Sequence, residues 1–275
     1  MLESKISHLP SLAQLTHEYL ARKSLGQNFL IDPNIARKIV DSADITSHDT
    51  IVEIGPGLGS LTRLLLLSPA QKIILIEKDK RFFDPLNQLV ALAPTRVTLY
   101  IVDALSFPLG DHLKGPCKIL ANLPYNIGTQ LVIDWLGTPQ RLTSLTLMLQ
   151  KEVVERLVAA PGTAAYGRLS IIAQWVCEIK KIMIVPASAF KPAPKVASAV
   201  VQLIPRAQPL YPAQKEKLEY LTHLLFQQRR KMVRGSLKGK IPNLEQALEH
   251  CGISPTARPE TLSIEALCKL THFMG

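Results

Sequence analysis

Cysteine is scarce in this sequence, and no two cysteines have the spacing of a metal site. The four that occur lie far apart in the chain, at Cys117, Cys177, Cys251 and Cys268. Without a CxxC pair they indicate reduced thiols, and they argue against both a disulfide framework and a metal site. We therefore expect a cytoplasmic protein that holds no metal.

Long apolar runs are missing as well. No apolar stretch approaches the ~20 residues that span a bilayer, so we expect no membrane partner. Residues 1–23 place Leu12, Leu15, Tyr19 and Leu20 at helical spacing, but they lack the continuous apolar core of a secretory signal. This N-terminal extension is predicted to form a short helix in front of the main domain.

Acidic residues are scarce in one region. The 275 residues carry a net charge of +10 with 47% hydrophobic residues, which is typical of a soluble globular protein. From Glu178 to Lys240 there are thirteen Lys or Arg against three Glu, a local excess of +10. Such clustering favours nucleic acid as a partner, because Lys and Arg displace the counterions condensed on it. Solubility alone would not require clustering, and this region lacks the Trp- or Phe-rich amphipathic helix of a membrane-surface protein.

From residue 50 onward, short β-branched runs alternate with helical patterns. Repeated βα units predict an α/β fold with a doubly wound, mainly parallel sheet, whose ligands lie beyond the carboxyl ends of the strands. The expected strands are residues 50–54, 72–77, 96–102, 117–121 and 145–150, and the expected helices are 61–67, 80–93, 127–136 and 151–160.

The ends of these expected strands are rich in acidic, amide and glycine residues. Glu77 follows Gly55 by twenty-two positions, close to the ~20 expected for a carboxylate that binds ribose hydroxyls. A dinucleotide fingerprint would have its third glycine at position 60, where this chain has Ser60. The four strand ends together predict one crevice for a nucleoside cofactor without a pyrophosphate; they read EIGPGLG (53–59), EKD (77–79), VDAL (102–105) and NLPY (122–125).

S-adenosylmethionine has the chemistry that this crevice could bind: a ribose diol, an adenine amine and a sulfonium cation. Glu77 would accept hydrogen bonds from the ribose hydroxyls, and Asp103 would accept one from the adenine amine. Asp103 has an alternative role as the N-cap of a helix that starts at residue 104. Capping and binding do not exclude each other.

The NLPY segment, residues 122–125, has two interpretations. Asn and Pro both favour turns, and a strand-to-helix connection requires one. Alternatively, the Asn122 side-chain oxygen and the Leu123 carbonyl would hold the hydrogens of an adenine N6 amine, so that its lone pair faces the methyl group. Pro124 would then fix the local backbone, and Tyr125 would stack on a base removed from its helix.

Seven sequence blocks together resemble the ribosomal RNA adenine dimethyltransferases, most closely their bacterial small-subunit branch. They run in family order from about residue 24 to residue 237 and are highly specific as a set. The blocks are SLGQNFLID (24–32), VEIGPGLGSLT (52–62), IEKD (76–79), NLPYNI (122–127), AYGRLS (165–170), FKPAPKVASAVV (190–201) and FQQRRKMVRGSL (226–237).

The resemblance implies a Rossmann-like methyltransferase domain with S-adenosylmethionine as cofactor. Asn28 and Leu30 match positions that close over the cofactor, and Gly55 matches the loop under its methionine part. Glu77 matches the ribose ligand and Asp103 the adenine ligand. Family members often begin close to the GQNFL block, whereas this chain has an extra turn or two before it, which leaves the role of residues 1–20 open.

The resemblance also implies how the target base is bound. Asn122 matches a residue that contacts both cofactor and target adenine, and Tyr125 matches the stacking aromatic residue. Phe190 matches a second aromatic contact on the flipped adenine, with ordinary packing as the alternative.

The implied reaction is N6,N6-dimethylation of two adjacent adenosines in the 3'-terminal hairpin loop of 16S rRNA, on the 30S subunit during ribosome biogenesis. A monomer is expected. One alternative is a large-subunit methyltransferase of the erythromycin-resistance type, which shares the front blocks. Another is a non-catalytic RNA-binding assembly factor with the same fold.

The sequence predicts three parts in the chain. An N-terminal extension (1–23) precedes a methyltransferase domain (24–204), and a Pro-containing linker leads to a helical RNA-binding domain (205–275). Helical spacing in this last part predicts helices within 213–231, 243–252 and 263–275. The basic stretch 227–240 is predicted to bind RNA phosphates through Arg229, Arg230, Lys231 and Arg234.

Overall fold

The computed structural model describes residues 2–113 and 115–274 and consists of two compact units. The first unit comprises Met1–Val154 and Lys180–Pro205, and the second comprises Glu155–Ile179 and Arg206–Gly275. Helix α8 (Lys151–Leu157) and strand β7 (Cys177–Val185) each cross this division along the chain.

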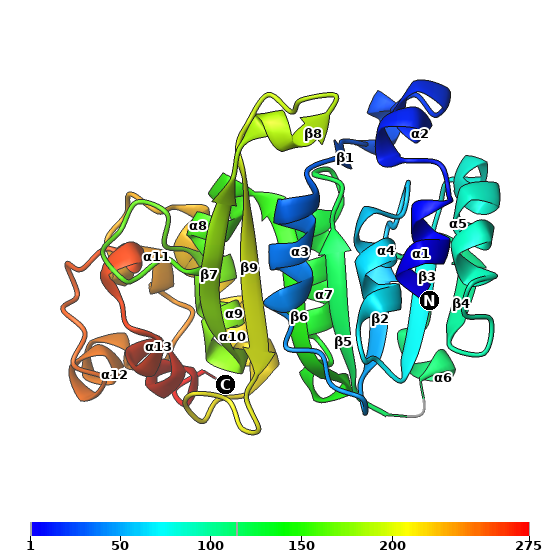
Figure 1. Ribbon diagram of the computed structural model, residues 1–275. Coiled ribbons are helices and arrows are strands. Elements are labelled where there is room, and N and C mark those ends of the chain that lie inside the picture. Colours follow the sequence, from blue (N-terminus) through cyan, green and yellow to red (C-terminus); the bar gives the residue numbers. More distant parts are fainter. Residues whose placement is uncertain (1, 114, 275) are drawn as a thin grey trace. The chain divides into compact units, whose positions relative to one another are not determined.

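The first unit is built around a seven-stranded sheet of strand order β4-β3-β2-β5-β6-β9-β7 (Figure 1). Strands β4, β3, β2, β5 and β6 run parallel, and β9 pairs antiparallel with β6. Buried β-branched and leucine side chains fill β2, β3 and β5, as expected for parallel strands covered on both faces. The bounds are β2 Thr50–Ile54, β3 Lys72–Glu77, β4 Val97–Ile101, β5 Cys117–Asn122, β6 Leu142–Gln150 and β9 Ser198–Pro205.

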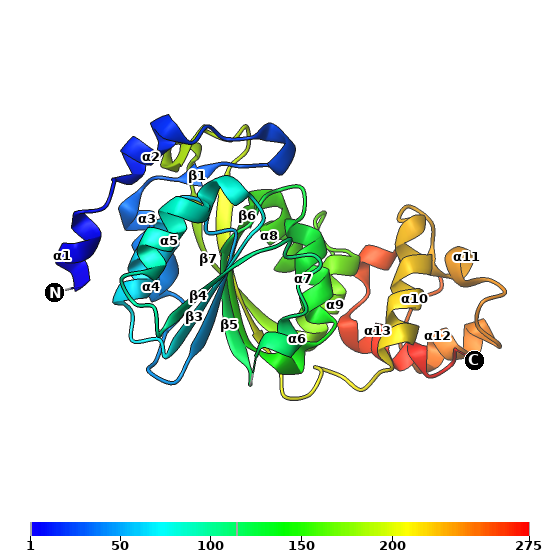
Figure 2. The same cartoon turned by 90° about the vertical axis from the view of Figure 1, so that its right-hand side faces the viewer.

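Helices cover both faces of this sheet. Figures 1 and 2 show α3 (Pro33–Asp41) and α4 (Ser60–Leu67) on one face and α7 (Gly128–Leu136) on the other. Further helical segments of the first unit are α5 (Phe83–Val90), α6 (Leu109–His112) and the 3-10 turns η1 (Lys23–Leu25), η2 (Lys80–Phe82), η3 (Pro139–Arg141) and η4 (Ala187–Ala189). The predicted α/β class with a mainly parallel, doubly wound sheet is confirmed.

The N-terminal extension forms two helices where the sequence predicted one. Helix α1 (Leu2–Ser7) and helix α2 (Leu12–Glu18) are separated by Pro10, which has no N–H to continue the first helix. Ser11 then starts the second helix with a capping box to Gln14. Leu15 is buried in the core of the first unit, so the extension belongs to that unit.

A short two-stranded sheet lies outside the main one. Strand β1 (Phe29–Leu30) pairs antiparallel with β8 (Phe190–Lys191), and Leu30 lies opposite Phe190. This pairing connects the GQNFL block to the FKPAPK block, two segments about 160 residues apart in the sequence.

The second unit is helical. It contains α9 (Arg168–Val176), α10 (Lys215–Gln227), α11 (Val233–Leu237), α12 (Leu244–His250), η5 (Pro259–Thr261) and α13 (Ile264–Thr271). Helices α10, α12 and α13 lie where the sequence predicted them, whereas α11 has five residues and was not predicted. Among the described residues, no helix combines the length and the apolar composition that crossing a membrane requires.

The two units do not have the same bounds as the predicted domains. The segment 155–179 groups with the C-terminal helices, because the Tyr166 hydroxyl donates to the Leu262 carbonyl (3.0 Å) and the Trp175 indole N–H donates to the Tyr211 carbonyl (2.7 Å). Such contacts join residues that are distant in sequence, which helical and strand periodicity does not record. The roles assigned to the predicted domains stay predictions.

Candidate active site at the carboxyl ends of the parallel strands

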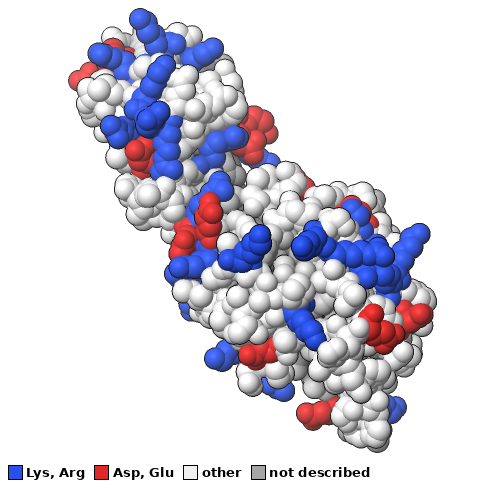
Figure 3. Space-filling view, turned by 90° about the horizontal axis from the view of Figure 1, so that it is seen from above, with Lys and Arg blue, Asp and Glu red and all other residues white. Residues whose placement is uncertain are grey.

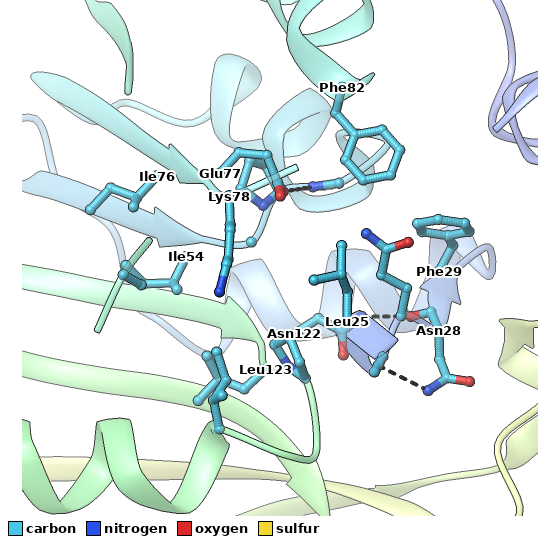
Figure 4. Close-up of a pocket in the computed structure, with 18 of the residues that line it drawn as sticks. Leu25, Asn28, Phe29, Ile54, Ile76, Glu77, Lys78, Phe82, Asn122 and Leu123 are labelled. Atoms are coloured by element: carbon cyan, nitrogen blue, oxygen red, sulfur yellow. Dashed lines mark hydrogen bonds between the residues drawn. The ribbon is translucent and has the colours of Figure 1, made fainter. Parts of the chain in front are cut away.

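A pocket of the first unit lies at the carboxyl ends of β2, β3 and β5 (Figure 4). Five segments and the Phe82 side chain line it: the loop 24–30, the glycine loop 53–58 with the start of α4, the end of β3 at 76–78, the turn at 103–104, and the NLPY segment with the two residues that follow. Glu77 and Lys78 lie on one side of the pocket, and Asn122 and Leu123 lie on the other (Figure 4). The four strand ends therefore meet in one crevice, as the sequence predicted.

The glycine loop leaves the floor of the pocket open. Gly55 has φ +65°, and a Cβ built there would meet nothing within 4 Å, so a side chain would project into free space at the pocket wall. Gly59 has φ +79°, and its Cβ would lie 2.5 Å from a Leu89 methyl group. Glycine at these two positions lets the backbone turn tightly into α4 and keeps room for a ligand.

Glu77 ends β3 and is 6% exposed. Its two carboxylate oxygens accept the Gly57 N–H at 3.0 Å and the Asp79 N–H at 2.7 Å. Burial raises the pKa of Glu77, and these backbone donors oppose that rise. Two fixed donors hold the carboxyl group in one orientation, with lone pairs left for further donors.

Glu53 is a second buried carboxyl group in the pocket lining, and the sequence interpretation did not select it. It is 1% exposed, and the Thr62 hydroxyl donates to it at 2.7 Å. Burial raises the pKa of Glu53 to about 8, with a further contribution from the charge of Glu77. At pH 7 Glu53 is therefore mostly neutral.

Asp103 lies at the pocket edge and is paired with Lys78. The Lys78 Nζ is 2.7 Å from one Asp103 carboxylate oxygen, and the Leu105 N–H donates to the other at 3.1 Å. These two contacts lower the pKa of Asp103. The residues after Asp103 form a turn, so the alternative role as a helix N-cap is replaced by the capping of that turn. Lys78 was not predicted as a site residue.

Asn122 has a fixed amide orientation. Its Nδ2 donates to the backbone carbonyl of Asn28 at 3.2 Å. This bond fixes which end of the amide is the nitrogen, so the other end is the oxygen, which is a hydrogen-bond acceptor. Leu123 donates its N–H to the Met148 carbonyl at 3.1 Å, and the Pro124 carbonyl accepts the Gly128 N–H at the start of α7. The turn interpretation of NLPY is thus correct as to structure, and it holds Asn122 and Leu123 in the pocket wall.

The predicted aromatic residues occupy different environments. Tyr125 lines the pocket, and its hydroxyl lies 2.6 Å from the Ser198 hydroxyl, with a pKa raised by burial. Phe190 is 4% exposed and belongs to the hydrophobic core of the first unit, and it is not among the described residues that line the pocket. The structure therefore gives Phe190 a packing role, and its contact with a flipped adenine stays a prediction.

The predicted cofactor residues share one pocket with the predicted target-base residues of the NLPY segment, whereas Phe190 is not among the described residues that line it. The NLPY segment, residues 122–125, lines this pocket along its whole length. The six predicted cofactor residues that line it are Asn28, Leu30, Gly55, Glu77, Asp103 and Asn122.

The predicted RNA-binding cations lie in the second unit, after the end of α10. Arg229 donates to the Thr163 carbonyl at 3.3 Å and lies 4.0 Å from the Glu260 carboxylate. Arg230 and Lys231 are exposed, and Arg234 is exposed on α11 with its guanidinium 4.0 Å from a Glu245 oxygen. Lys and Arg side chains gather on the face of the protein shown in Figure 3. The helix expected to reach residue 231 ends earlier, so the first three cations lie on the loop that follows it.

A family model described as ribosomal RNA adenine dimethylase matches residues 19–274. The chain belongs to the ribosomal RNA adenine dimethylase family. Similar relatives include ribosomal RNA small subunit methyltransferase A from Ruegeria sp. (strain TM1040), 48% identical, and from Dinoroseobacter shibae, 46% identical, each match covering 98% of both chains. These matches include most of the N-terminal extension, so the extension does not set this chain apart from them.

Solved structures of the same kind are also similar. A dimethyladenosine transferase from Plasmodium falciparum has a TM-score of 0.77 at 28% identity, covering 87% of this chain and 94% of that one. The 23S rRNA methyltransferase ErmE has a TM-score of 0.71 at 28% identity, covering 90% of this chain and 99% of that one. The family resemblance predicted from the seven sequence blocks is confirmed.

Proposed function

We propose that this chain is an S-adenosylmethionine-dependent enzyme that dimethylates N6 of adenosines in 16S rRNA. The observation that carries the proposal is the meeting of the Asn122 amide and the Glu77 carboxyl group in one pocket at the strand ends. The family match and the small-subunit relatives support the same activity. The finer proposal is that two adjacent adenosines of the 3'-terminal hairpin are the targets, on the 30S subunit, with a cytoplasmic monomer as the enzyme.

The residues of the pocket fit S-adenosylmethionine, whose sulfonium makes its methyl group electrophilic. Glu77 presents a carboxyl group, fixed by two backbone donors, that would accept the ribose hydroxyls. The open wall at Gly55 leaves room for the methionine part, and Asn28 and Leu30 line the opposite loop. Asp103 would accept a hydrogen bond from the adenine amine and would keep its ion pair with Lys78.

The chain's own groups would orient the target amine. An adenine N6 amine is a poor nucleophile, because its lone pair is delocalised into the ring. The Asn122 side-chain oxygen and the Leu123 carbonyl would accept its hydrogens and turn the lone pair towards the methyl donor, while Pro124 restricts the backbone next to them. Each methyl gained would cost the nitrogen one proton, which needs no strong base because the alkylated amine is acidic. Tyr125 would stack on the base.

The substrate is tested with methyl-labelled cofactor and four nucleic acids: naked 16S rRNA, immature 30S particles, 23S rRNA and DNA. The proposal expects label in 16S rRNA, as free RNA or in particles. Label confined to 23S rRNA would support the erythromycin-resistance type, whose structural similarity to this chain makes it the second candidate. No label in any substrate, together with binding to 30S particles, would support a non-catalytic assembly factor.

A further inference from the structure

Asp79 and Arg81 form a charged pair just outside the pocket. The Arg81 Nε donates to both Asp79 carboxylate oxygens, at 3.0 and 3.1 Å, and Nη2 donates to one of them at 2.6 Å. Burial alone would raise the pKa of Asp79, but hydrogen bonds from Arg81 and Gln27 bring it to about 2. The pair therefore stays ionised throughout the neutral range.

The same guanidinium holds two points of the N-terminal loop. Nη1 donates to the Leu20 carbonyl at 3.0 Å, just after α2, and Nη2 donates to the Gln27 side-chain oxygen at 3.2 Å. The Gln27 amide in turn donates to Asp79 at 2.9 Å. The Arg22 N–H donates to the Gln27 oxygen at 2.9 Å, which closes the loop on itself. We call these four residues, Leu20, Gln27, Asp79 and Arg81, the clamp.

The clamp adjoins the hydrogen-bond partners of both groups that carry the proposed function, Asn122 and Glu77. Gln27 precedes Asn28, whose carbonyl accepts the Asn122 amide. The Asp79 N–H donates to Glu77. Neither Asp79 nor Arg81 is among the described residues that line the pocket, so any effect of this pair on a ligand passes through these neighbours.

We infer that Asp79 and Arg81 are positioning residues, which hold the loop 20–28 against the end of β3 and so fix the partners of Asn122 and Glu77. The inference rests on the proposed function. It assigns a role to the N-terminal extension, because helix α2 leads directly to Leu20 in the clamp. The clamp holds this arrangement of the loop 20–28 before any ligand binds.

The test compares Arg81→Gln with Arg63→Gln. Arg63 also binds a carbonyl of the extension, that of Pro10 at 2.7 Å, but it has no contact with the clamp among the described residues. Hydrogen exchange of the ligand-free protein is measured at the amides of Leu25, Gly26 and Gln27, which bond within the loop. Affinity for S-adenosylhomocysteine is measured by calorimetry.

Arg81→Gln is expected to speed exchange at these three amides and to weaken S-adenosylhomocysteine binding about tenfold. Arg63→Gln should change neither, and Arg81→Lys should restore part of the affinity, because a single ammonium reaches fewer of the acceptors. Should Arg81→Gln fail to fold, Gln27→Ala breaks the same link from the loop side; because Gln27 itself lines the pocket, this variant is judged by its exchange at Leu25 and Gly26 alone.

Unchanged exchange at the three amides in Arg81→Gln would overturn the inference, and so would an equal loss of affinity in Arg63→Gln. The exchange readout needs no ligand and no rRNA. A parent protein that transfers no methyl group to 16S rRNA would therefore refute the proposed function while the exchange data still decide the clamp.

Discussion

The pocket of the first unit and the basic stretch 227–240 of the second unit use polar side chains in opposite ways. In the pocket, Glu77 and Asn122 are held by hydrogen bonds of 2.7 to 3.2 Å to backbone groups. In the basic stretch, Arg234 on α11 is exposed and its acidic neighbour Glu245 lies 4.0 Å away. Fixed groups suit the orientation of one reacting atom, whereas exposed cations suit a polyanion that is bound by charge. Mutations should therefore act on chemistry in the first unit and on salt-dependent affinity in the second.

The largest effect is expected from Asn122→Ala. Removing one acceptor leaves the target amine badly oriented, so methyl transfer should fall by at least ~10²-fold in an initial-rate assay. Gln130→Ala serves as the matched control, because the Gln130 amide donates to Asp134 on the same helix, α7. Activity of Asn122→Ala within a factor of two of the parent would refute its role.

Glu77→Gln should weaken cofactor binding by about 30-fold and leave RNA affinity unchanged, because it replaces one of the two carboxyl oxygens at the ribose position with an amide donor. The amide NH2 of the variant would also face one of the two backbone N–H groups that now donate to the Glu77 carboxyl group, which places two donors against each other. Calorimetry with S-adenosylmethionine measures the change, with the exposed Glu152→Gln on α8 as control. Equal affinities for parent and Glu77→Gln would rule out the ribose contact.

RNA binding by the basic stretch 227–240 should depend on salt concentration. Replacing Arg229, Arg230, Lys231 and Arg234 with Gln should weaken binding to 30S particles and lower the slope of log affinity against log salt by roughly 0.7 to 0.9 per lost phosphate contact. Filter binding at several salt concentrations measures this, with Lys215→Gln and Lys269→Gln as a charge control elsewhere in the unit.

Arg229 allows this prediction to be sharpened. It bonds the Thr163 carbonyl, so Arg229→Gln alone should also lower the melting temperature, whereas Arg230→Gln should not. If the variant with all four replacements keeps the parent's affinity for 30S particles and the parent's salt dependence, these four side chains do not bind RNA and are only solvated.

The smallest effect is a pH dependence of stability from Glu53. Its pKa rises from 4.5 to about 8 on folding, so between these values the folded state keeps a proton that the unfolded chain has lost. Stability should therefore fall as pH rises through this window. The side chain of the Glu53→Gln variant does not titrate. Between pH 5 and pH 8 the melting temperature of this variant should therefore fall by about 5 °C less than that of the parent. Parallel melting curves for the two proteins would contradict the assignment.

The parallel strands and helices α10, α12 and α13 were predictable from local patterns, whereas other parts of the fold depended on distant contacts. Strands β2, β3 and β5 are short apolar runs with polar ends, a local pattern that marks both the strand and the pocket edge. The antiparallel strand β9 and the grouping of residues 155–179 with the C-terminal helices arise from tertiary pairing.

The site shows the same division. Glu77 and Asn122 were selected from strand-end motifs, and both line the pocket. Lys78 and Glu53 lie within the same motifs, but their roles depend on an ion pair and on burial that the sequence does not display. Phe190 was selected by resemblance alone, and the structure places it in the core.

The central claim is tested most directly by nucleoside analysis of 16S rRNA after reaction with the parent protein and S-adenosylmethionine. The account predicts N6,N6-dimethyladenosine at two adjacent positions of the 3'-terminal hairpin, and none after reaction with Asn122→Ala. Methylation of another base or another atom, or full dimethylation by Asn122→Ala, would contradict it.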